Sequence, residues 1–459
     1  MAAALAASLL SACALGPDYQ RPAQDVPALY RGQADATAAA LGVADWRAVY
    51  VEPALQSLID TALAANLDLQ IAASRVDQAA AALGRQRLAQ LPQIDGEGAV
   101  SRAQSSEYAI TPGQDRLGER GSVDVGFAWE LDFWGRLRRL SEAARAEYLG
   151  SLQGQRAVRV SLIANVASAY YSLCALDERS RAATRSVEAR EAFLKLTQAQ
   201  SQRGVISGLD VASAEAQLAA AQVSVHDLMR QRQQTENALS VLLAQTAQPI
   251  EQGQCAAPVT AGAGLPSTLL ERRPDILQAE QALVAANARI GVAKAALFPS
   301  LSLTGAFGAL STDVSELLTA PAETWSVGVG LLQPLLNADR NLYQVDLSRA
   351  RSREALLQYE KTVRNAFREV ADALIAGSAN AEVLKAQQAQ VGALRRAEEI
   401  AQARYKAGYS SYFDVINADR DLFAAEQAQA QASLAVKLAT VDLYRALGGG
   451  WDGAPAPPQ

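Results

Sequence analysis

Histidine is nearly absent from this chain, which carries only His226 among its 459 residues. A catalytic pair of histidines and a metal site with several histidine ligands are therefore excluded. The sequence also lacks the clustered cysteine and histidine residues of metal sites and the glycine-rich loops that hold phosphates. We accordingly predict a protein that is not an enzyme and that uses neither a cofactor nor a metal.

Three further shortages narrow the class of protein. Aromatic residues make up only 6% of the chain, so the chain has few large side chains with which to fill a large globular core. No run rich in lysine or arginine occurs, and the net charge is -6, which argues against a nucleic-acid partner. No uninterrupted apolar run is long enough for a transmembrane helix, so entry into a membrane would require a β-barrel.

Alanine, glutamine, arginine, leucine and glutamate dominate the composition, which is typical of long helices packed closely side by side. The length alone would allow two to four ordinary domains. A narrow coiled-coil-like seam, with apolar residues at alternating spacings of four and three, is formed by Leu162, Val166, Ala169, Leu173 and Leu176. A helix that continues this seam over its whole stretch would be about 100 Å long.

The first thirteen residues, MAAALAASLLSAC, form a short apolar stretch that suits a signal peptide. The tetrapeptide that ends at Cys13 resembles a bacterial lipobox, in which cleavage precedes a cysteine that is then acylated; an ordinary secretory signal is the alternative. No lysine or arginine precedes the apolar stretch, so the true start of translation stays open. Ala14 is not the aspartate that retains lipoproteins in the inner membrane, which favours the outer membrane.

An internal repeat with an offset of about 204 to 207 residues organises the chain. Gly204, Asp210, Val211, Ala214 and Leu218 align with Gly408, Asp414, Val415, Ala418 and Leu422. A period this long is not that of a short solenoid repeat. We interpret it as a duplicated half-molecule.

Each half has the same order of elements: a helix, two β-like segments, a very long helix, a glycine-bearing turn and a last helix. The first half places them at 54–90, 94–108, 121–133, 136–203 and 209–245. The second half places them at 274–297, 299–310, 323–333, 339–407 and 413–447. The predicted domains are a signal peptide (1–12), a lipid-anchored extended segment (13–53), a first repeat (54–247), a linker (248–273), a second repeat (274–447) and a tail (448–459).

The β-like segments alternate apolar with small or polar side chains, as Leu301, Leu303 and Phe307 do with Ser302 and Thr304. A half-buried soluble sheet and a set of membrane-barrel strands both explain this alternation. Four strands cannot close a membrane barrel, and an open sheet edge is not tolerated in lipid. Membrane-spanning strands would therefore require several chains, and three copies would supply twelve.

Several strings occur in the order found in a known family. They are GPDYQRP (16–22), FAWELDFWGRLRR (127–139), ERRPDI (271–276), GVAKAALFPSLSLTG (291–305) and GYSSYFDVINADRDL (408–422). With the duplication and the lipobox, they resemble the outer-membrane factors, the TolC- and OprM-like exit ducts of tripartite efflux pumps, nearest to the NodT-type lipoproteins. The matches span nearly the whole mature chain.

The resemblance implies a mainly α homotrimer in the outer membrane of a Gram-negative bacterium. Its twelve-stranded β-barrel, four strands from each chain, would continue into a long α-helical barrel through the periplasm. Outer-membrane lipid, a periplasmic adaptor and an inner-membrane pump of the RND type are the implied partners. The duct would conduct passively, and the sequence does not identify the exported substrate.

By the same resemblance, the turns at 203–210 and 407–414 form the periplasmic tip, where the family's gate holds a tyrosine and an arginine with carboxylates. Tyr405 matches the gate tyrosine, Asp414 matches a gate aspartate, and Asp210 is its partner in the other repeat. Ser410 stands where some members have the arginine, and Asn417 where some have a second aspartate.

We therefore expect closure to rest on Tyr405, Tyr412 and Asp414 with the packing of Val415 and Ile416. Capping of a helix N-terminus is the simpler role for both aspartates and does not exclude a gate role. The residues expected to contact the adaptor at the tip are Arg203, Gly204 and Gly408. Ordinary helix termination at glycine is the alternative for the two glycines.

Four aromatic residues suit the membrane–water borders of the barrel: Trp129, Phe133, Trp134 and Trp325. Cys174 lies in the middle of a long predicted helix, and Cys255 lies in the linker. The oxidising periplasm permits a disulfide between them. An unpaired cysteine, however, also packs well as a small apolar residue in an alanine-rich helix. The sequence slightly favours two free thiols.

Two other classes of protein compete with a channel. A periplasmic adaptor would need lipoyl-like β-domains and a single helical hairpin, whereas this chain predicts two hairpins in tandem. A coiled-coil structural lipoprotein would not need the alternating β-like segments.

Overall fold

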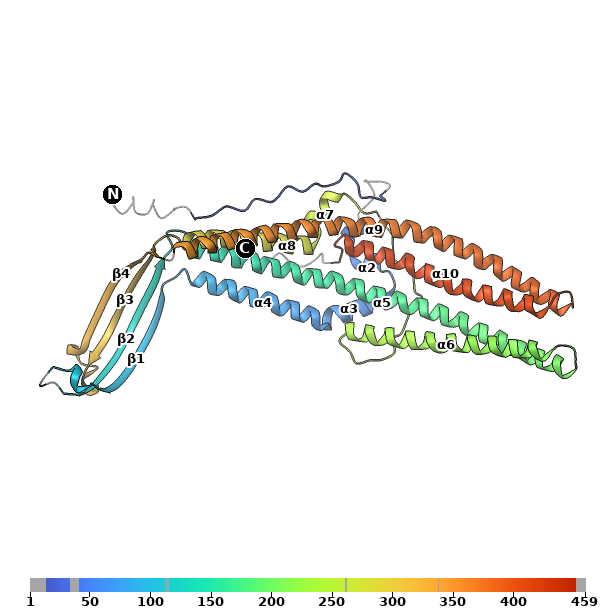
Figure 1. Ribbon diagram of the computed structural model, residues 1–459, viewed down its shortest axis with the longest axis horizontal. Coiled ribbons are helices and arrows are strands. Elements are labelled where there is room, and N and C mark those ends of the chain that lie inside the picture. Colours follow the sequence, from blue (N-terminus) through green and yellow to red (C-terminus); the bar gives the residue numbers. More distant parts are fainter. Residues whose placement is uncertain are drawn as a thin grey trace. The chain divides into compact units, whose positions relative to one another are not determined.

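The computed structural model of the chain describes residues 14–33, 41–111, 113, 115–260, 262–336 and 338–450. Cys13, the predicted signal peptide and residues 451–459 of the predicted tail lie outside the described residues. The described chain forms long helices and one four-stranded sheet (Figure 1).

The helices follow the order expected of a duplicated chain. The first half contains α2 (Trp46–Val49), α3 (Pro53–Ala65), α4 (Leu67–Leu88), α5 (Arg136–Gln202) and α6 (Gly208–Leu242). The second half contains α7 (Pro266–Arg272), α8 (Pro274–Ala295), α9 (Ala338–Lys406) and α10 (Tyr412–Ala446). Helices α5 and α9 have 67 and 69 residues, so the prediction of two very long helices is confirmed to within a residue at each end.

The predicted helix 54–90 is in fact two helices, α3 and α4, which meet at Asn66. The Asn66 side chain accepts a hydrogen bond from the Leu69 N–H (3.0 Å) and donates one to the Leu242 carbonyl (2.9 Å). The buried asparagine therefore caps α4 while α3 ends beside it. The prediction of one helix was wrong because neither proline nor glycine marks this break.

The sheet is an antiparallel meander in the order β1 (Gln93–Gln104), β2 (Leu117–Leu131), β3 (Ser300–Ser311) and β4 (Glu323–Leu332). Its register pairs Val125 with Phe307, and Phe307 with Trp325. Because side chains alternate along each strand, this register gathers the large apolar residues of the four strands on one face. The opposite face carries the small and polar residues, as in the pair Thr304 and Gly328.

The residue at position 305 is a glycine because an aromatic ring of the neighbouring strand packs against it. A Cβ placed there would lie 2.3 Å from the Phe127 ring, so the ring covers the glycine across the strand pair. An aromatic residue that covers a cross-strand glycine restores apolar contact on that face.

The chain divides into two compact units, each drawn from both sequence halves. One unit comprises Met1–Ala23, Arg75–Leu152 and Gln278–Glu360, and the other comprises Gln24–Ser74, Gln153–Leu277 and Lys361–Gln459. The repeated halves are therefore interleaved instead of forming separate domains. In the first unit, α5 packs on α8 through Ala143, Ala146, Ala285 and Ala288.

A short part of the linker, residues 252–256, is held by several elements of the second unit; we call it the linker clasp. The Glu52 carboxylate accepts hydrogen bonds from the N–H groups of Gln254 and Ala256, both at 3.1 Å. The Tyr170 hydroxyl accepts one from the Gly253 N–H at 3.1 Å. Glycine at 253 leaves room for the Glu52 carboxylate, because an added Cβ would lie 1.9 Å from a Glu52 oxygen and would displace that side chain.

Cys255 of the clasp forms a disulfide with Cys174 of α5, so the slight preference for two free thiols was wrong. The Cys255 carbonyl also accepts a hydrogen bond from Lys437 Nζ of α10 (3.0 Å). Burial lowers the pKa of Lys437. The clasp thus joins the first repeat to the last helix of the second repeat.

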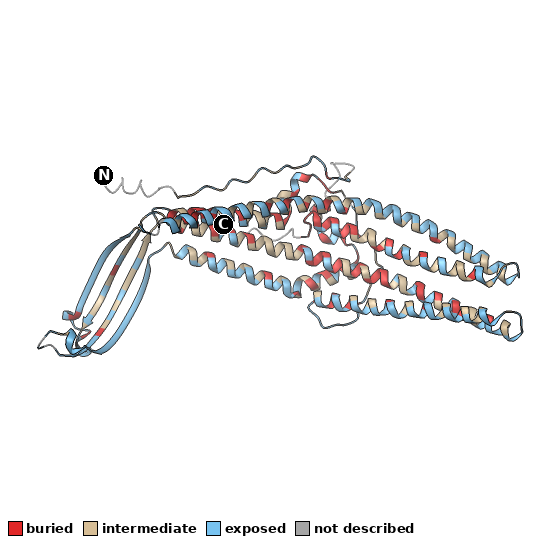
Figure 2. Ribbon diagram, in the orientation of Figure 1, coloured by how far each residue is buried: buried red, intermediate tan, exposed pale blue. Residues whose placement is uncertain are grey.

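Burial separates the helices from the sheet. In Figure 2 most of the buried residues lie along the helices, whereas the strands are largely exposed. Among the described helices, α5 alone contains a window apolar enough to cross a membrane by length and composition, and 67% of that window is buried within the chain. Such burial is also found in the core helix of a packed bundle.

Candidate functional site

Two turns with the same local structure join α5 to α6 and α9 to α10. At the end of α5, the Val205 N–H bonds to the Gln200 carbonyl and the Gly204 N–H to the Ser201 carbonyl. This is the Schellman pattern, with Gly204 at a φ of 72°. The α9 end repeats it through Gly408, whose φ is 78°. Ordinary helix termination thus accounts for both glycines, and Arg203 lies exposed in the first turn.

The helices that follow these turns start with the same cap. The Asp210 carboxylate accepts hydrogen bonds from the backbone N–H (3.0 Å) and hydroxyl (2.9 Å) of Ser207. Asp414 accepts the equivalent pair from Ser411, both at 3.1 Å. Both aspartates occupy the first turn of their helices, where a negative charge favours the helix dipole.

Three aromatic rings pack together between the hairpins. Tyr412, the first residue of α10, stacks on Phe193 of α5 with centroids 4.1 Å apart. Tyr405, near the end of α9, lies 5.6 Å from Phe193 and 6.0 Å from Tyr412. The Tyr405 hydroxyl donates to Oε1 of Gln200 (2.8 Å). Burial raises the pKa of Tyr405, and it raises the pKa of Tyr412 to about 12, so both phenols stay neutral.

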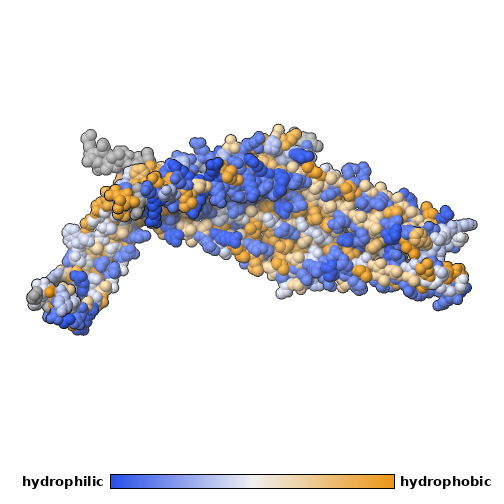
Figure 3. Space-filling model, in the orientation of Figure 1, coloured by the Kyte–Doolittle hydropathy of each residue, from blue (hydrophilic) through white to orange (hydrophobic). Residues whose placement is uncertain are grey.

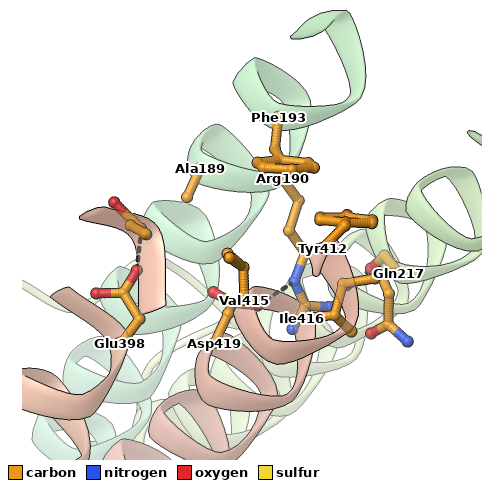
Figure 4. A pocket seen from close by; sticks show the side chains of 10 residues that line it. Ala189, Arg190, Phe193, Gln217, Glu398, Tyr412, Val415, Ile416 and Asp419 are labelled. Carbon is orange, nitrogen blue, oxygen red and sulfur yellow. Dashed lines mark hydrogen bonds and ion pairs between the residues drawn. The ribbon is translucent and has the colours of Figure 1, made fainter. Parts of the chain in front are cut away.

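Arg190 of α5 joins three helices beside this cluster (Figure 4). Its side chain is 9% exposed, and its Nε donates to Oδ2 of Asp419 in α10 at 2.8 Å. Its Nη1 donates to the Gln217 carbonyl in α6 at 2.7 Å. A buried guanidinium with a carboxylate and a carbonyl partner is costly to disrupt, because removal of one partner leaves the other uncompensated. The three-helix contact of Arg190 is called the arginine latch below.

The latch borders a pocket with an empty volume of about 370 Å³, open solvent included. Tyr412, Val415 and Ile416 contribute apolar side chains to it, and Glu398 of α9 contributes a carboxylate. Burial raises the pKa of Glu398, and the nearby Asp419 charge adds to the shift. The pocket therefore combines an apolar wall with two carboxylates and one guanidinium.

The remaining predicted tip residue, Asn417, is half-buried in the first turns of α10. The structure brings Tyr405 and Tyr412 together, whereas Asp210 and Asp414 each cap their own helix. Sequence reasoning missed Phe193, Gln200, and the latch pair Arg190 and Asp419. Phe193 is one of only 8 phenylalanines and could have drawn notice, but no pattern distinguishes Arg190 from the other arginines of α5.

The predicted border aromatics lie near both ends of the strands. Trp129 Nε1 donates to the Gln90 carbonyl (3.0 Å), and Trp134 Nε1 donates to the Pro299 carbonyl (2.8 Å). Phe133 and Trp134 come two and three residues after the end of β2. Trp325 lies near the start of β4, which is the opposite end of the sheet, and is 72% exposed.

Comparison with known proteins decides the family. A family model described as outer membrane efflux protein matches residues 58–245 and 265–449. The chain belongs to the outer membrane efflux protein family. It is 37% identical over 463 residues to the probable efflux pump outer membrane protein TtgC of Pseudomonas putida, covering 98% of this chain and 95% of that protein. It is 33% identical to the cation efflux system protein CusC of Escherichia coli, covering 96% of each.

The solved structures of this family agree with the fold. The open state of the MtrE outer membrane channel of Neisseria gonorrhoeae superposes with a TM-score of 0.85 at 30% identity, covering 96% of this chain and 99% of that one. Like its relatives, this efflux protein is an outer-membrane channel of an efflux pump in a Gram-negative bacterium. Its family consists of channel proteins, in agreement with the channel hypothesis and against the adaptor and coiled-coil hypotheses.

Proposed function

We propose that the chain forms a homotrimeric exit duct which passively conducts substrates delivered by a periplasmic adaptor and an inner-membrane pump of the RND type. The edges of the sheet are the main support for a trimer. Among the described strands, β1 and β4 each have a strand partner on one side only. Unpaired backbone groups are not tolerated in lipid. In a trimer, β4 of each chain pairs with β1 of the next, which closes a barrel of twelve strands.

The distribution of side chains supports the orientation of these strands. Apolar residues share one face of the sheet and meet lipid, and the other face, with Asp95, Glu97 and Asp124, lines an aqueous lumen. The two repeats, 54–247 and 274–447, supply two strands and one helical hairpin each. The linker 248–273 forms part of the equatorial region.

The proposed gate lies at the two turns. The arginine latch and the stack of Phe193 on Tyr412 hold the α5–α6 hairpin against the α9–α10 hairpin. Some family members have a gate arginine at the position of Ser410. In this chain, Arg190 and its partner Asp419 supply the arginine–carboxylate contact instead. The exposed residues of the turns, with Arg203, Gly204 and Gly408, form the contact surface for the adaptor.

Lipidation anchors the duct in the membrane. Cys13 follows the signal peptide in the lipobox-like string, and acylation there attaches the segment 13–53 to the outer membrane. A lipoprotein with several acyl chains remains firmly bound, whereas a single chain does not.

Single-channel conductance in a planar bilayer tests the proposed duct and gate. We compare the wild type with Arg190→Met and with Asp419→Asn, and we use Arg185→Met as the control. Arg185 lies on the same helix and pairs with Glu426 at 3.3 Å, but its side chain is 62% exposed. We expect a small, mostly closed wild-type conductance that rises in both latch variants and stays unchanged in the control. Large channels that none of the variants alters would place the gate elsewhere, and the absence of any conductance from folded protein would refute the duct.

A further inference from the structure

An apolar groove lies where the sheet joins the helices of the first unit. It has an empty volume of about 940 Å³, open solvent included, and Figure 3 shows apolar residues gathered in this region. Its lining includes Phe133, Trp134, Phe298, Pro299 and Leu332. Phe133, Trp134 and Phe298 remain 38%, 36% and 40% exposed, respectively, so the groove presents an exposed apolar surface.

The wall of this groove is fixed by its own contacts. Trp134 stacks on Phe298 with ring centroids 4.7 Å apart, and its indole N–H is bonded to the Pro299 carbonyl. At the rim, Arg136 and Glu130 form a two-point ion pair with distances of 2.8 and 2.6 Å. An apolar floor beside a charged rim suits a hydrocarbon chain attached to a polar group.

Ala14 and Leu15 of the N-terminal segment lie beside this groove. The Leu15 N–H donates to the Trp134 carbonyl (3.1 Å), and Nε of Arg139 donates to the Leu15 carbonyl (3.2 Å). Ala14 packs directly on Gly135, where an added Cβ would lie 2.7 Å from the Ala14 Cα. Gly135 has a φ of 74°, so glycine is required there for the backbone as well as for the contact.

Further contacts hold the same segment in place. Asp18 pairs with Nη2 of Arg139 at 2.7 Å, and the side chain of Arg139 is only 7% exposed. The Asn287 side chain donates to the Pro17 carbonyl (2.8 Å). Gly16 meets Gly291 of α8 backbone to backbone, since a Cβ on Gly16 would lie 2.5 Å from the Gly291 Cα. Residues 14–18 are thus docked along their length.

Cys13 directly precedes the docked residue Ala14 in the sequence. We propose that the groove holds an acyl chain of the lipid attached to this chain's own Cys13. The inference rests on the proposed lipidation of Cys13. It gives the docked N-terminal segment a role: the segment delivers the acyl chain to one site beside Phe133 and Trp134 and so fixes where the lipid enters the membrane.

Photo-crosslinking of the full chain tests this site. The chain is expressed with its signal peptide in a Gram-negative host that incorporates a diazirine-bearing fatty acid, and membranes are irradiated before digestion and mass spectrometry. We expect a crosslinked pair in which the N-terminal peptide with acylated Cys13 is joined through the fatty chain to peptides containing 132–136 or 295–300. Ala296→Glu places a carboxylate in the groove and should lower the yield about tenfold, because a charge is strongly disfavoured against hydrocarbon.

Ala82→Glu, at an exposed position of α4 outside the groove lining, is the matched control and should leave the yield unchanged. Heat-modifiable migration on gels verifies that both variants fold. If Cys13 is acylated but the groove peptides carry phospholipid or no adduct, the inference is overturned and the lipoprotein remains. If the N-terminal peptide carries no acyl group, the lipidation and the inference both fall, while the conductance measurement decides the duct independently.

Discussion

Removal of the disulfide between Cys174 and Cys255 should destabilise the chain by a calculable amount. The bridge spans a sequence separation of 81 residues, which encloses the end of α5, the first turn and all of α6. Closing a loop of this length removes conformational entropy from the unfolded chain, and the loop-entropy relation gives about 4.5 kcal/mol. With an unfolding entropy of about 2.1 cal/mol/K per residue, a chain of this size that unfolds as one unit would lose about 4 to 5 °C in Tm.

The assay is thermal unfolding in detergent of the wild type, Cys174→Ser, Cys255→Ser and the double variant, each with and without a reductant. Because each single substitution already opens the bridge, we expect all three variants to unfold at about the same lowered temperature. The reductant should lower the Tm of the wild type alone. Additive losses, or a wild type that does not respond to a reductant that demonstrably frees both thiols, would refute the argument. In that case the hydrogen bonds of the linker clasp, through Glu52 and Tyr170, would hold it without the covalent bond.

The other predictions concern the sheet, the latch and acidification. Val327→Arg places a charge on the apolar face and should cost about 2–4 kcal/mol near the middle of the membrane, whereas Ser326→Arg on the opposite face should assemble normally; a gel assay of folded trimer in outer-membrane fractions that shows equal assembly would contradict the assigned faces. Arg190→Met should cost about 3 kcal/mol because it leaves Asp419 without its buried partner, and in a double-variant cycle with Asp419→Asn the losses should not add; additive losses in Tm would exclude the latch. The raised pKa of Glu398 means that its contribution to stability is present below its unfolded pKa of about 4.3 and is lost as the pH rises through the folded value. Glu398→Gln should therefore raise the Tm at about pH 7 and lose this advantage near pH 4, and a gain of equal size at both values would contradict the assigned cause.

The sequence predicted the architecture well because the architecture is periodic. Alternation at a period of two and apolar spacing at three and four residues fix strands and long helices over many positions, and the repeat predicts each half from the other. The break at Asn66 was missed because a single buried side chain makes it. The sequence identified Cys174 and Cys255 as possible disulfide partners but slightly favoured free thiols, because the path of the linker that brings them together has no periodic pattern.

The proposed gate was only partly predictable from the sequence for the same reason. Tyr405 and Tyr412 could be found by position in a motif, and the structure packs both on Phe193. Asp210 and Asp414 were found as well, but their hydrogen bonds are those of helix caps. Arg190 and Asp419 come from different repeats, 229 positions apart, and an ion pair at that separation leaves no local signal in one sequence.

The two unpartnered edges of the sheet have a genetic consequence. If β4 of one copy must complete β1 of the next, then no copy can finish its own membrane part, and a single faulty copy leaves a gap that two sound copies cannot fill. An allele with a disrupted β4 but intact β1 would therefore have a dominant-negative effect when it is expressed together with the normal gene. Resistance to exported compounds would then fall faster than the share of normal protein in the cell.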